Sequence, residues 1–237
     1  MVIVKPVTQE AKKAAHEECQ RTCSDPLKCQ KNGLIFVENC FFPCPDYQLH
    51  KQTRGLQKRL NQSIPQALQE AELENYQCQN DSQFEVIATA KRYFKKKAWQ
   101  KGKGMIISGL QGLGKSHIVV AMYKQLMQKG ISTVFSRPKT MGDYKSIEKY
   151  YQQLEKPKVL IYDDMGPELR KDFILDLLFI LLDKRLSSNK GVIITTNIPT
   201  NALKNTLGPR IHSRLAEKNF FLEVKGGDYR QLKRELY

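Results

Sequence analysis

Residues 109–116 read GLQGLGKS, which fits the pattern G-x-x-x-x-G-K-[ST]. In such a loop the glycines let backbone N–H groups close around phosphates, and the start of the next helix adds partial positive charge. Lys115 would reach the β- and γ-phosphates of a nucleotide, and Ser116 would hold Mg²⁺. A strand-like MIIS precedes the loop and a helical HIVVAMYKQLMQKG follows it. The spacing therefore favours a nucleotide-binding loop over a turn that is merely rich in glycine.

Two carboxylates end the strand-like segment KVLIYDDMGPE further along the chain. Asp163 and Asp164 would lie at the C-terminal end of a strand, where α/β sheets bind their ligands. Asp163 would complete the Mg²⁺ shell, and Asp164 would orient the water that attacks the γ-phosphate. The alternative is a strand-to-helix turn in which one aspartate caps the helix.

Two further polar segments follow the acidic pair. GVIITTNIPT ends in Thr195, Thr196 and Asn197, and the asparagine could hold the same water, although Asn-Ile-Pro is also a plain strand exit. In LGPRIHSRLAE, Arg210 and Arg214 stand four residues apart and so share one face of a short helix. An arginine there could enter a neighbouring subunit's nucleotide site and stabilise charge on the transferring phosphoryl group. The alternative is a solvated helix face.

The elements that would position these residues follow a regular pattern. After residue 104 the apolar runs MIIS, STVF, VLIY and VIIT alternate with segments of helical period. This alternation predicts an α/β fold with a parallel sheet covered by helices on both faces. The apolar run 173–182 is about half as long as a bilayer crossing requires, so we expect a buried helix there. No signal peptide is recognisable at the N-terminus, and we expect a cytoplasmic protein without membrane contact.

The charge of the chain is uneven. Its 39 Lys and Arg residues against 24 Asp and Glu leave a net charge of +15 in 237 residues. Residues 1–100 carry 15 basic and 11 acidic groups, whereas residues 101–237 carry 24 and 13. The second part is therefore the candidate for binding a polyanion such as nucleic acid, with a lysine-rich solubilising surface as the alternative. Lys139, Lys145 and Lys149 are plausible contacts.

The N-terminal segment, residues 1–50, is dense in cysteines and turn formers and has little hydrophobic periodicity. Such a small unit needs a stabilising cross-link or bound metal, because it buries little apolar area by itself. Five cysteines spaced a few residues apart can satisfy tetrahedral Zn²⁺, although buried free thiols are the alternative. They are Cys19, Cys23, Cys29, Cys40 and Cys44. A polar segment, residues 51–84, follows as a linker.

These elements in this order resemble the AAA+ ATPases, and more narrowly the DnaC/DnaI type of replicative helicase loader, with the IstB transposition helpers as relatives. The resemblance covers residues 62–237 and includes IPQALQEAELENY, GKSHIVVAM, YDDMGPE, TTNIP and SRL. It implies a P-loop AAA+ core over residues 85–237 that binds and hydrolyses ATP with Mg²⁺. The sequence ends soon after Arg214, so we expect no C-terminal lid domain, as is common in loaders of this family.

The resemblance also implies roles for individual residues. In the family's terms, Walker B comprises Asp163 and Asp164, Asn197 is sensor 1, and Arg214 is the arginine finger, with Arg210 as its substitute. Asp-Asp departs from the more usual Asp-Glu, which implies slow hydrolysis. The residues expected to bind the cofactor around the loop are Gly109, Gly112, Leu113, Gly114, Lys115, Ser116 and His117.

Loaders of the DnaI type carry a similar cysteine cluster in an N-terminal domain that grips the helicase. By that similarity the zinc ligands would be Cys19, Cys23, Cys29 and Cys44. Either Cys40 or His16 could replace one of them, and Cys78 would be a free thiol.

The expected function is thus an ATP-dependent loader. It would bind the hexameric replicative DNA helicase, deliver it to single-stranded DNA, and self-associate through its ATP sites. One alternative is an IstB-like transposition helper, which would share the core, so the N-terminal cysteines favour the loader. The other is an adaptor or inhibitor of the helicase that binds nucleotide without turnover.

Overall fold

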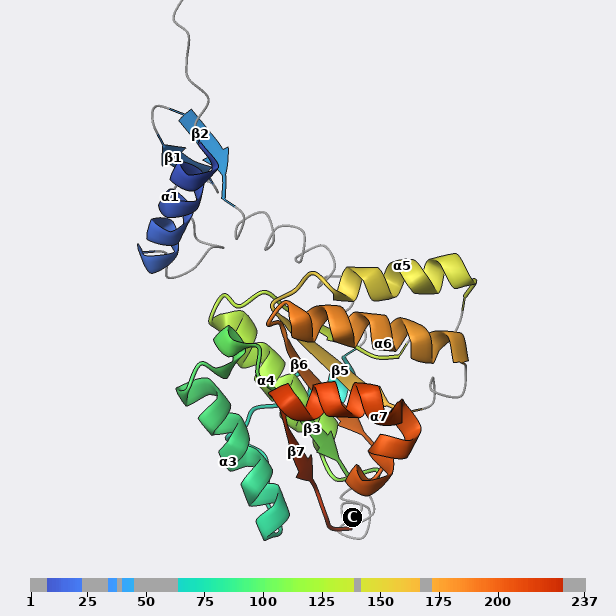
Figure 1. The fold of residues 1–237 in the computed structure, drawn as a ribbon. Coiled ribbons are helices and arrows are strands. Elements are labelled where there is room, and N and C mark those ends of the chain that lie inside the picture. The colour runs from blue at the N-terminus through green and yellow to red at the C-terminus, as the bar shows by residue number, and fades with distance from the viewer. Residues whose placement is uncertain are drawn as a thin grey trace, which may run out of the picture.

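The computed structural model describes two units, each treated by itself (Figure 1). The described residues are 8–22, 34–37, 40–44, 64–138, 142–166 and 172–227. The smaller unit consists of helix α1 (Gln9–Thr22) beside an antiparallel hairpin of β1 (Leu34–Val37) and β2 (Cys40–Pro43). Ile35 and Cys44 are buried within it.

The larger unit is built on a five-stranded sheet in which every pairing is parallel, in the order β4-β5-β6-β3-β7. The strands are β3 (Gly104–Ser108), β4 (Thr133–Ser136), β5 (Val159–Met165), β6 (Gly191–Thr196) and β7 (Asn219–Glu223). The first four coincide with the predicted apolar runs. The edge strand β7 was not predicted, because only one of its faces is buried and its sequence NFFLE is short.

Helices cover both faces of the sheet, as the alternating pattern predicts (Figure 1). One face packs against α3 (Asp81–Lys95) and α4 (Lys115–Gln128), with the short η4 (Ala98–Lys101) beside them. The other packs against α5 (Tyr144–Leu154), α6 (Asp172–Ser187) and α7 (Thr200–Lys218). The expected α/β architecture, a parallel sheet flanked by helices, is therefore confirmed.

Helix α6 contains the apolar run 173–182. One side of the helix is buried between its neighbours, as expected, whereas Ile180 on the other side is 44% exposed. Helix α7 is bent at Gly208, whose φ of 77° lies in the left-handed region, and Pro209 follows. The bend separates the segment that carries Arg210 and Arg214 from the first half of α7. In the part of the chain that the structure describes, no helix is long and apolar enough to span a bilayer.

The described end of the predicted linker, residues 64–80, packs against the larger unit. It forms the short helix η3 (Gln66–Leu68), and Ala71 and Leu73 are buried in the same cluster as α3 and α4. The Tyr76 hydroxyl donates to the carbonyl oxygen of Leu113 (2.8 Å). Residues assigned to a linker thus contribute to the core beside the phosphate loop.

Candidate functional site

The glycine-rich loop connects the central strand β3 to helix α4, and two of its glycines are required by close contacts. A Cβ at Gly109, where φ is 147°, would come within 2.3 Å of the Val224 carbonyl oxygen. At Gly114, where φ is 79°, it would come within 2.6 Å of the Tyr76 ring. Gly114 is also the N-cap of α4 and supplies no side-chain cap, so the helix presents its first-turn N–H groups to the loop.

Lys115 lies at the start of α4 with its side chain folded against the loop. Its Nζ donates to the carbonyl oxygens of Gly109 (2.7 Å) and Leu110 (2.6 Å) and to Oδ1 of Asn197 (2.8 Å). The residue is 7% exposed, so its charge is held by these oxygens rather than by bulk water.

Asp163, at the end of β5, is fully buried and accepts hydrogen bonds on both carboxylate oxygens. Its Oδ1 accepts from the hydroxyls of Ser116 (2.9 Å) and Thr195 (2.7 Å). Thr195 also accepts from the backbone N–H of Asp164 (2.8 Å), so it links the two aspartates. Thr195 was predicted from sequence to lie at a strand end, without a role of its own.

The second oxygen of Asp163 accepts from a residue that was not predicted from sequence to lie in the site. Arg137 donates to Oδ2 through Nε (3.2 Å) and Nη2 (3.1 Å). Its backbone carbonyl accepts from the Tyr150 hydroxyl of α5 (2.6 Å). No local motif marks this arginine, which follows β4, and only the parallel pairing of β4 with β5 brings it beside the carboxylate.

Asn197 follows β6, the strand that lies between β3 and β5. Its Oδ1 accepts from Lys115, and its Nδ2 donates to Oδ1 of Asp164 (3.0 Å). Asp164 is exposed and has a positive φ of 65°, a conformation that turns it out of the strand. The side-chain amide therefore bridges the lysine of the loop and the second aspartate.

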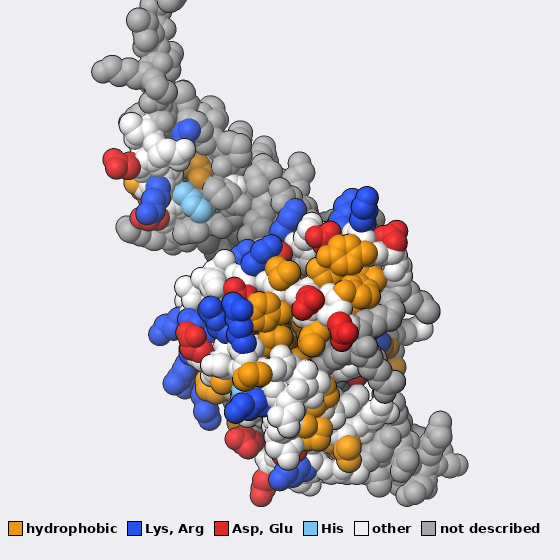
Figure 2. All heavy atoms as spheres, turned by 45° about the vertical axis from the view of Figure 1, so that its right-hand side comes forward, with side chains coloured by type: hydrophobic (Ala, Val, Ile, Leu, Met, Phe, Trp, Pro, Cys, Tyr) orange, Lys and Arg blue, Asp and Glu red, His pale blue; other side chains and the backbone are white. Residues whose placement is uncertain are grey.

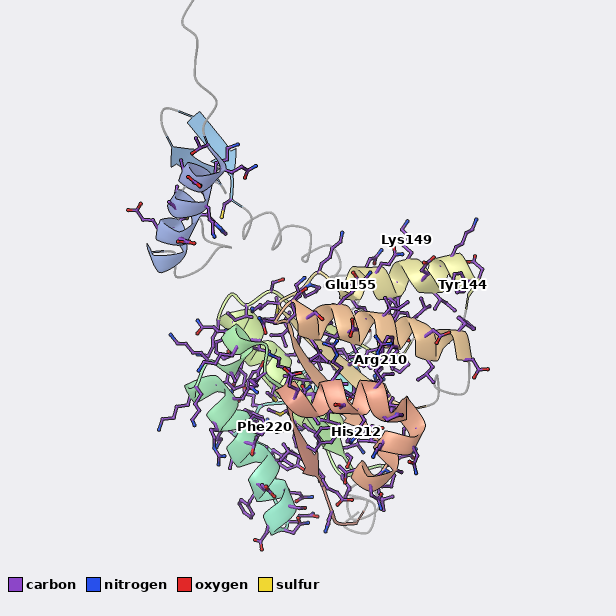
Figure 3. The ribbon with its side chains drawn as sticks, in the orientation of Figure 1. Tyr144, Lys149, Glu155, Arg210, His212 and Phe220 are labelled. Carbon is purple, nitrogen blue, oxygen red and sulfur yellow. The ribbon has the colours of Figure 1, made fainter. Side chains whose placement is uncertain are left out.

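The two arginines of α7 contact α6 rather than this cluster. Nη2 of Arg214 lies 3.4 Å from Oδ1 of Asp183, at the distance of an ion pair but without hydrogen-bond geometry. The Arg210 guanidinium lies 4.6 Å from the ring centroid of Phe179. Figure 3 shows Arg210 pointing from α7 towards α6. Arg214 is about half exposed, which suits a contact with a second molecule.

A pocket that is open to solvent adjoins the loop. Nε2 of His117 donates to the Glu72 carbonyl oxygen (2.9 Å), and the His117 ring meets that of Tyr76 edge to face at 5.5 Å. The pocket combines aromatic surface with several side-chain amides, as small-molecule sites do. Its lining residues are Asn75, Tyr76, Gln77, Gln79, Gln83, Leu113, Gly114 and His117.

The donor set fits magnesium and a nucleotide phosphate. The Ser116 hydroxyl and the Asp163 carboxylate converge to 2.9 Å, and oxygens of these types are the ligands that Mg²⁺ prefers. An ammonium group, a helix N-terminus and loop N–H groups surround the place where phosphates would lie.

The predicted zinc ligands lie in the smaller unit. Cys44 is buried and Cys19 is partly exposed, and neither forms a disulfide. Cys23 and Cys29 lie outside the described residues, as does the side chain of Cys40. Among the described residues there is no cluster of three or more His, Cys, Asp or Glu side chains that could hold a metal ion.

A phosphate loop after the central strand, an aspartate pair on β5 and an asparagine on the strand between them define a P-loop AAA+ ATPase core. The sequence profile of the family described as "IstB-like ATP binding protein" matches residues 46–236. The chain therefore belongs to the IstB-like ATP-binding protein family.

Individual relatives agree with this assignment. The chain is 28% identical over 179 residues to the uncharacterized protein YdaV of Escherichia coli K12, covering 71% of this chain and 72% of that protein. It is 27% identical over 169 residues to the replicative helicase loader DnaC of Buchnera aphidicola subsp. Schizaphis graminum, covering 67% and 68%. The crystal structure of the DnaC helicase loader matches with a TM-score of 0.58 and 26% identity over 68% of this chain and 100% of that one. The resemblance inferred from the motifs is thus confirmed.

The contact between Arg137 and Asp163 leads to a prediction about magnesium. Because the guanidinium neutralises the carboxylate that would contact Mg²⁺, Arg137→Ala should lower the Mg²⁺ concentration for half-maximal ATP binding by about threefold to tenfold, as expected for a half-exposed ion pair. The measurement is equilibrium binding of a fluorescent ATP analogue at increasing Mg²⁺. Arg92→Ala, an exposed arginine on α3, is the control. An unchanged or higher Mg²⁺ requirement would show that Arg137 does not compete with the ion.

Proposed function

We propose that this protein is an ATP-dependent loader that binds the hexameric replicative DNA helicase and delivers it to single-stranded DNA. One observation carries the proposal: Lys115, Asn197 and Asp164 form a continuous chain of contacts at the end of a P-loop sheet. That arrangement suits a switch that responds to ATP. Relatives that match over two thirds of both chains are named replicative helicase loaders, which supports the helicase as the partner.

In the proposed mode of binding, the phosphates of ATP lie on the loop and its base lies in the adjoining pocket. Lys115 exchanges its loop carbonyls for β- and γ-phosphate oxygens, while Gly109, Gly112 and Gly114 allow the backbone to approach them. The rings of Tyr76 and His117 and the amide of Gln83 are available to the base. Leu113 is buried beneath the loop and keeps it in place.

For hydrolysis, Asp164 and Asn197 would hold the attacking water. The exposed carboxylate of Asp164 would accept a hydrogen bond from this water, and the side-chain amide of Asn197 keeps Asp164 oriented. Ser116 and Asp163 would hold Mg²⁺, which neutralises phosphate charge. Arg214 would act on a neighbouring subunit's nucleotide in a self-associated form, with Arg210 as the substitute.

The smaller unit, within residues 1–50, is proposed as a zinc-stapled domain that docks on the helicase. Cys19, Cys23, Cys29 and Cys44 remain its proposed ligands.

The ATPase unit would extend from about residue 64, because residues 64–80 pack on its core. A cytoplasmic location fits a partner that acts on DNA. Membership of the IstB-like family supports a second candidate function, that of a transposition helper. Its partner would be another DNA-processing enzyme in place of the helicase.

A pull-down against the replicative helicase of the same organism tests the proposal. Helicase should be retained by the wild-type protein, and the retained amount should differ between ATP and ADP. Lys115→Ala should remove the difference between nucleotides but keep binding, whereas replacing Cys19 and Cys23 with serine should remove binding altogether. Absence of helicase in every state would reject the loader and favour the transposition helper.

A further inference from the structure

The segments that enter the five strands lie together on the edge of the sheet opposite the phosphate loop, because all strands are parallel. We call this edge the strand-entry face and define it as residues 97–103, 129–132, 155–158, 184–190 and 217–218. These segments contain ten basic residues, of which Arg185 is fully buried, and only two acidic residues, Glu155 and Glu217. The basic residues are Lys97, Lys101, Lys103, Lys129, Lys156, Lys158, Lys184, Arg185, Lys190 and Lys218.

Hydrogen bonds and close backbone contacts join the entries of β5, β6, β3 and β7 into one surface. A Cβ on Gly102 would lie 2.6 Å from the backbone of Asn189, so the turns before β3 and β6 touch. The carbonyl oxygen of Asn189 accepts from Nζ of Lys158 (3.1 Å), and its side-chain oxygen accepts from Nζ of Lys218 (3.2 Å). Lys103 donates to the Glu217 carbonyl oxygen (3.1 Å).

The entry of β4 joins the same surface through the backbone, because Val159 donates to the Ser132 carbonyl oxygen (3.1 Å). Lys190 crosses from the β6 entry to the β5 entry, where it donates to the Glu155 carbonyl oxygen (2.8 Å). These lysines thus hold the entry turns together through one N–H each. An ammonium group carries three N–H donors, so each can still meet an anion at the surface.

The two acidic residues do little to neutralise this face. Oε1 of Glu155 pairs with Lys184 (2.9 Å), and Oε1 of Glu217 lies 3.7 Å from Lys218. Burial lowers the pKa of Lys158 and of Lys190, and the positive charge of Arg185 lowers both further. Figure 2 shows blue Lys and Arg side chains gathered along one margin of the larger unit.

The dimensions suit a nucleic-acid strand. Neighbouring strands of a sheet lie about 4.8 Å apart, so five entries span about 19 Å. A row of this length could meet several successive phosphates of one strand. Lysine contacts of this kind read no base sequence.

An exposed aromatic ring lies at one end of the row. Phe220 is 49% exposed, in the edge strand β7 directly after Lys218 and Asn219. Figure 3 shows Phe220 between α3 and α7, and Glu155 at the C-terminal end of α5. Helix α3, which packs beside β7, adds the exposed Lys91, Arg92 and Lys95. A basic row with a flat aromatic surface beside it is the arrangement that binds single-stranded nucleic acid.

We propose that the strand-entry face binds the phosphate backbone of single-stranded DNA and that Phe220 stacks on one of its bases. This inference rests on the proposed function for its partner, but it concerns a surface remote from the phosphate loop. It also differs from the lysines considered from sequence. Lys145 and Lys149 lie exposed on α5, and Lys139 lies outside the described residues.

The test compares two triple variants of the full chain with equal change in net charge. Lys101, Lys129 and Lys156 are exposed on the strand-entry face, and Lys145, Lys149 and Lys204 are exposed on α5 and α7. One variant has the first three lysines replaced with glutamate, and the other has the second three replaced with glutamate. Anisotropy of labelled oligo(dT) is measured over a series of salt concentrations.

The face variant should bind oligo(dT) at least about tenfold more weakly, and its log–log salt slope should fall by about 2, since each single-strand contact contributes about 0.7. The α5/α7 variant should change affinity less than threefold. Equal weakening of both variants, or wild-type binding by the face variant, would overturn the proposal.

Phe220→Ala separates single strands from duplex. It should weaken oligo(dT) binding about fivefold or more, within the range for loss of one stacking contact, and leave duplex binding unchanged. Equal loss for duplex would overturn the stacking role.

ATP binding, measured on every variant, should stay normal. If the wild type binds ATP and helicase but no DNA, the strand-entry face is rejected while the ATP site stands. If the face variant loses helicase instead of DNA, the face belongs to an acidic protein partner and this proposal fails.

Discussion

Lys115→Ala is expected to lower ATP turnover by at least about 100-fold and to weaken ATP binding by about tenfold or more. Among the contacts of the described residues, Nζ of Lys115 is the only ammonium group that donates to the loop carbonyls and to Asn197. The residue is 7% exposed. Its removal therefore takes away phosphate charge neutralisation and also the partner of Asn197. Phosphate release and binding of a fluorescent ATP analogue measure the two effects.

The control for this variant is Lys124→Ala, on the same helix. Nζ of Lys124 donates to the Gln69 carbonyl oxygen (2.8 Å), away from the loop. Turnover by this variant should remain within about twofold of wild type, because a partly exposed contact of this kind contributes little. Wild-type turnover by Lys115→Ala would mean that the loop does not serve the chemistry assigned to it.

Arg185→Ala should destabilise the larger unit by about 3–5 kcal/mol, the range for breaking a buried charged network. Arg185 is fully buried at the end of α6 and donates to the carbonyl oxygens of Leu154 (2.7 Å), Pro157 (3.0 Å) and Gly191 (2.8 Å). Burial lowers its pKa to about 9, so the guanidinium stays charged at neutral pH. Its loss leaves carbonyls of the strand-entry turns without their donor.

Thermal unfolding of the full chain measures this effect, with an expected fall in Tm of about 10 °C. The neighbouring Lys184→Ala removes an exposed ion pair with Glu155 and should shift the stability by less than about 1 kcal/mol. A similar Tm for Arg185→Ala and wild type would contradict the assigned role. A variant that fails to fold at all would agree with it, and Arg185→Met, which keeps the packing volume, should then fold with an intermediate loss.

The sequence predicts the parts of the site that are local in the chain. The loop from Gly109 to Ser116 must follow a strand and start a helix, so its neighbours settle its structure. Strands β3, β4, β5 and β6 appear as apolar runs because both of their faces are buried. The polar residues that follow β5 and β6 could likewise be placed at the same edge of the sheet.

Other features depend on which strands pair, which no short stretch of sequence specifies. Arg137 reaches Asp163 only because β4 lies beside β5. Tyr76 covers the loop although 37 residues separate it from Leu113 in sequence. The basic strand-entry face is assembled from five segments, each with only one to three basic residues, so its charge is visible only after folding.

The central claim, that ATP controls delivery of a helicase to DNA, is tested most directly by a loading measurement. Helicase, the protein and closed circular single-stranded DNA are incubated with ATP, with ADP, or with the Lys115→Ala variant and ATP, and helicase bound to the circle is counted after gel filtration. The account predicts that wild-type protein with ATP raises the bound helicase well above the level without loader, and that Lys115→Ala does not. Equal loading by the wild type and Lys115→Ala, or no effect of the protein in any state, would contradict it.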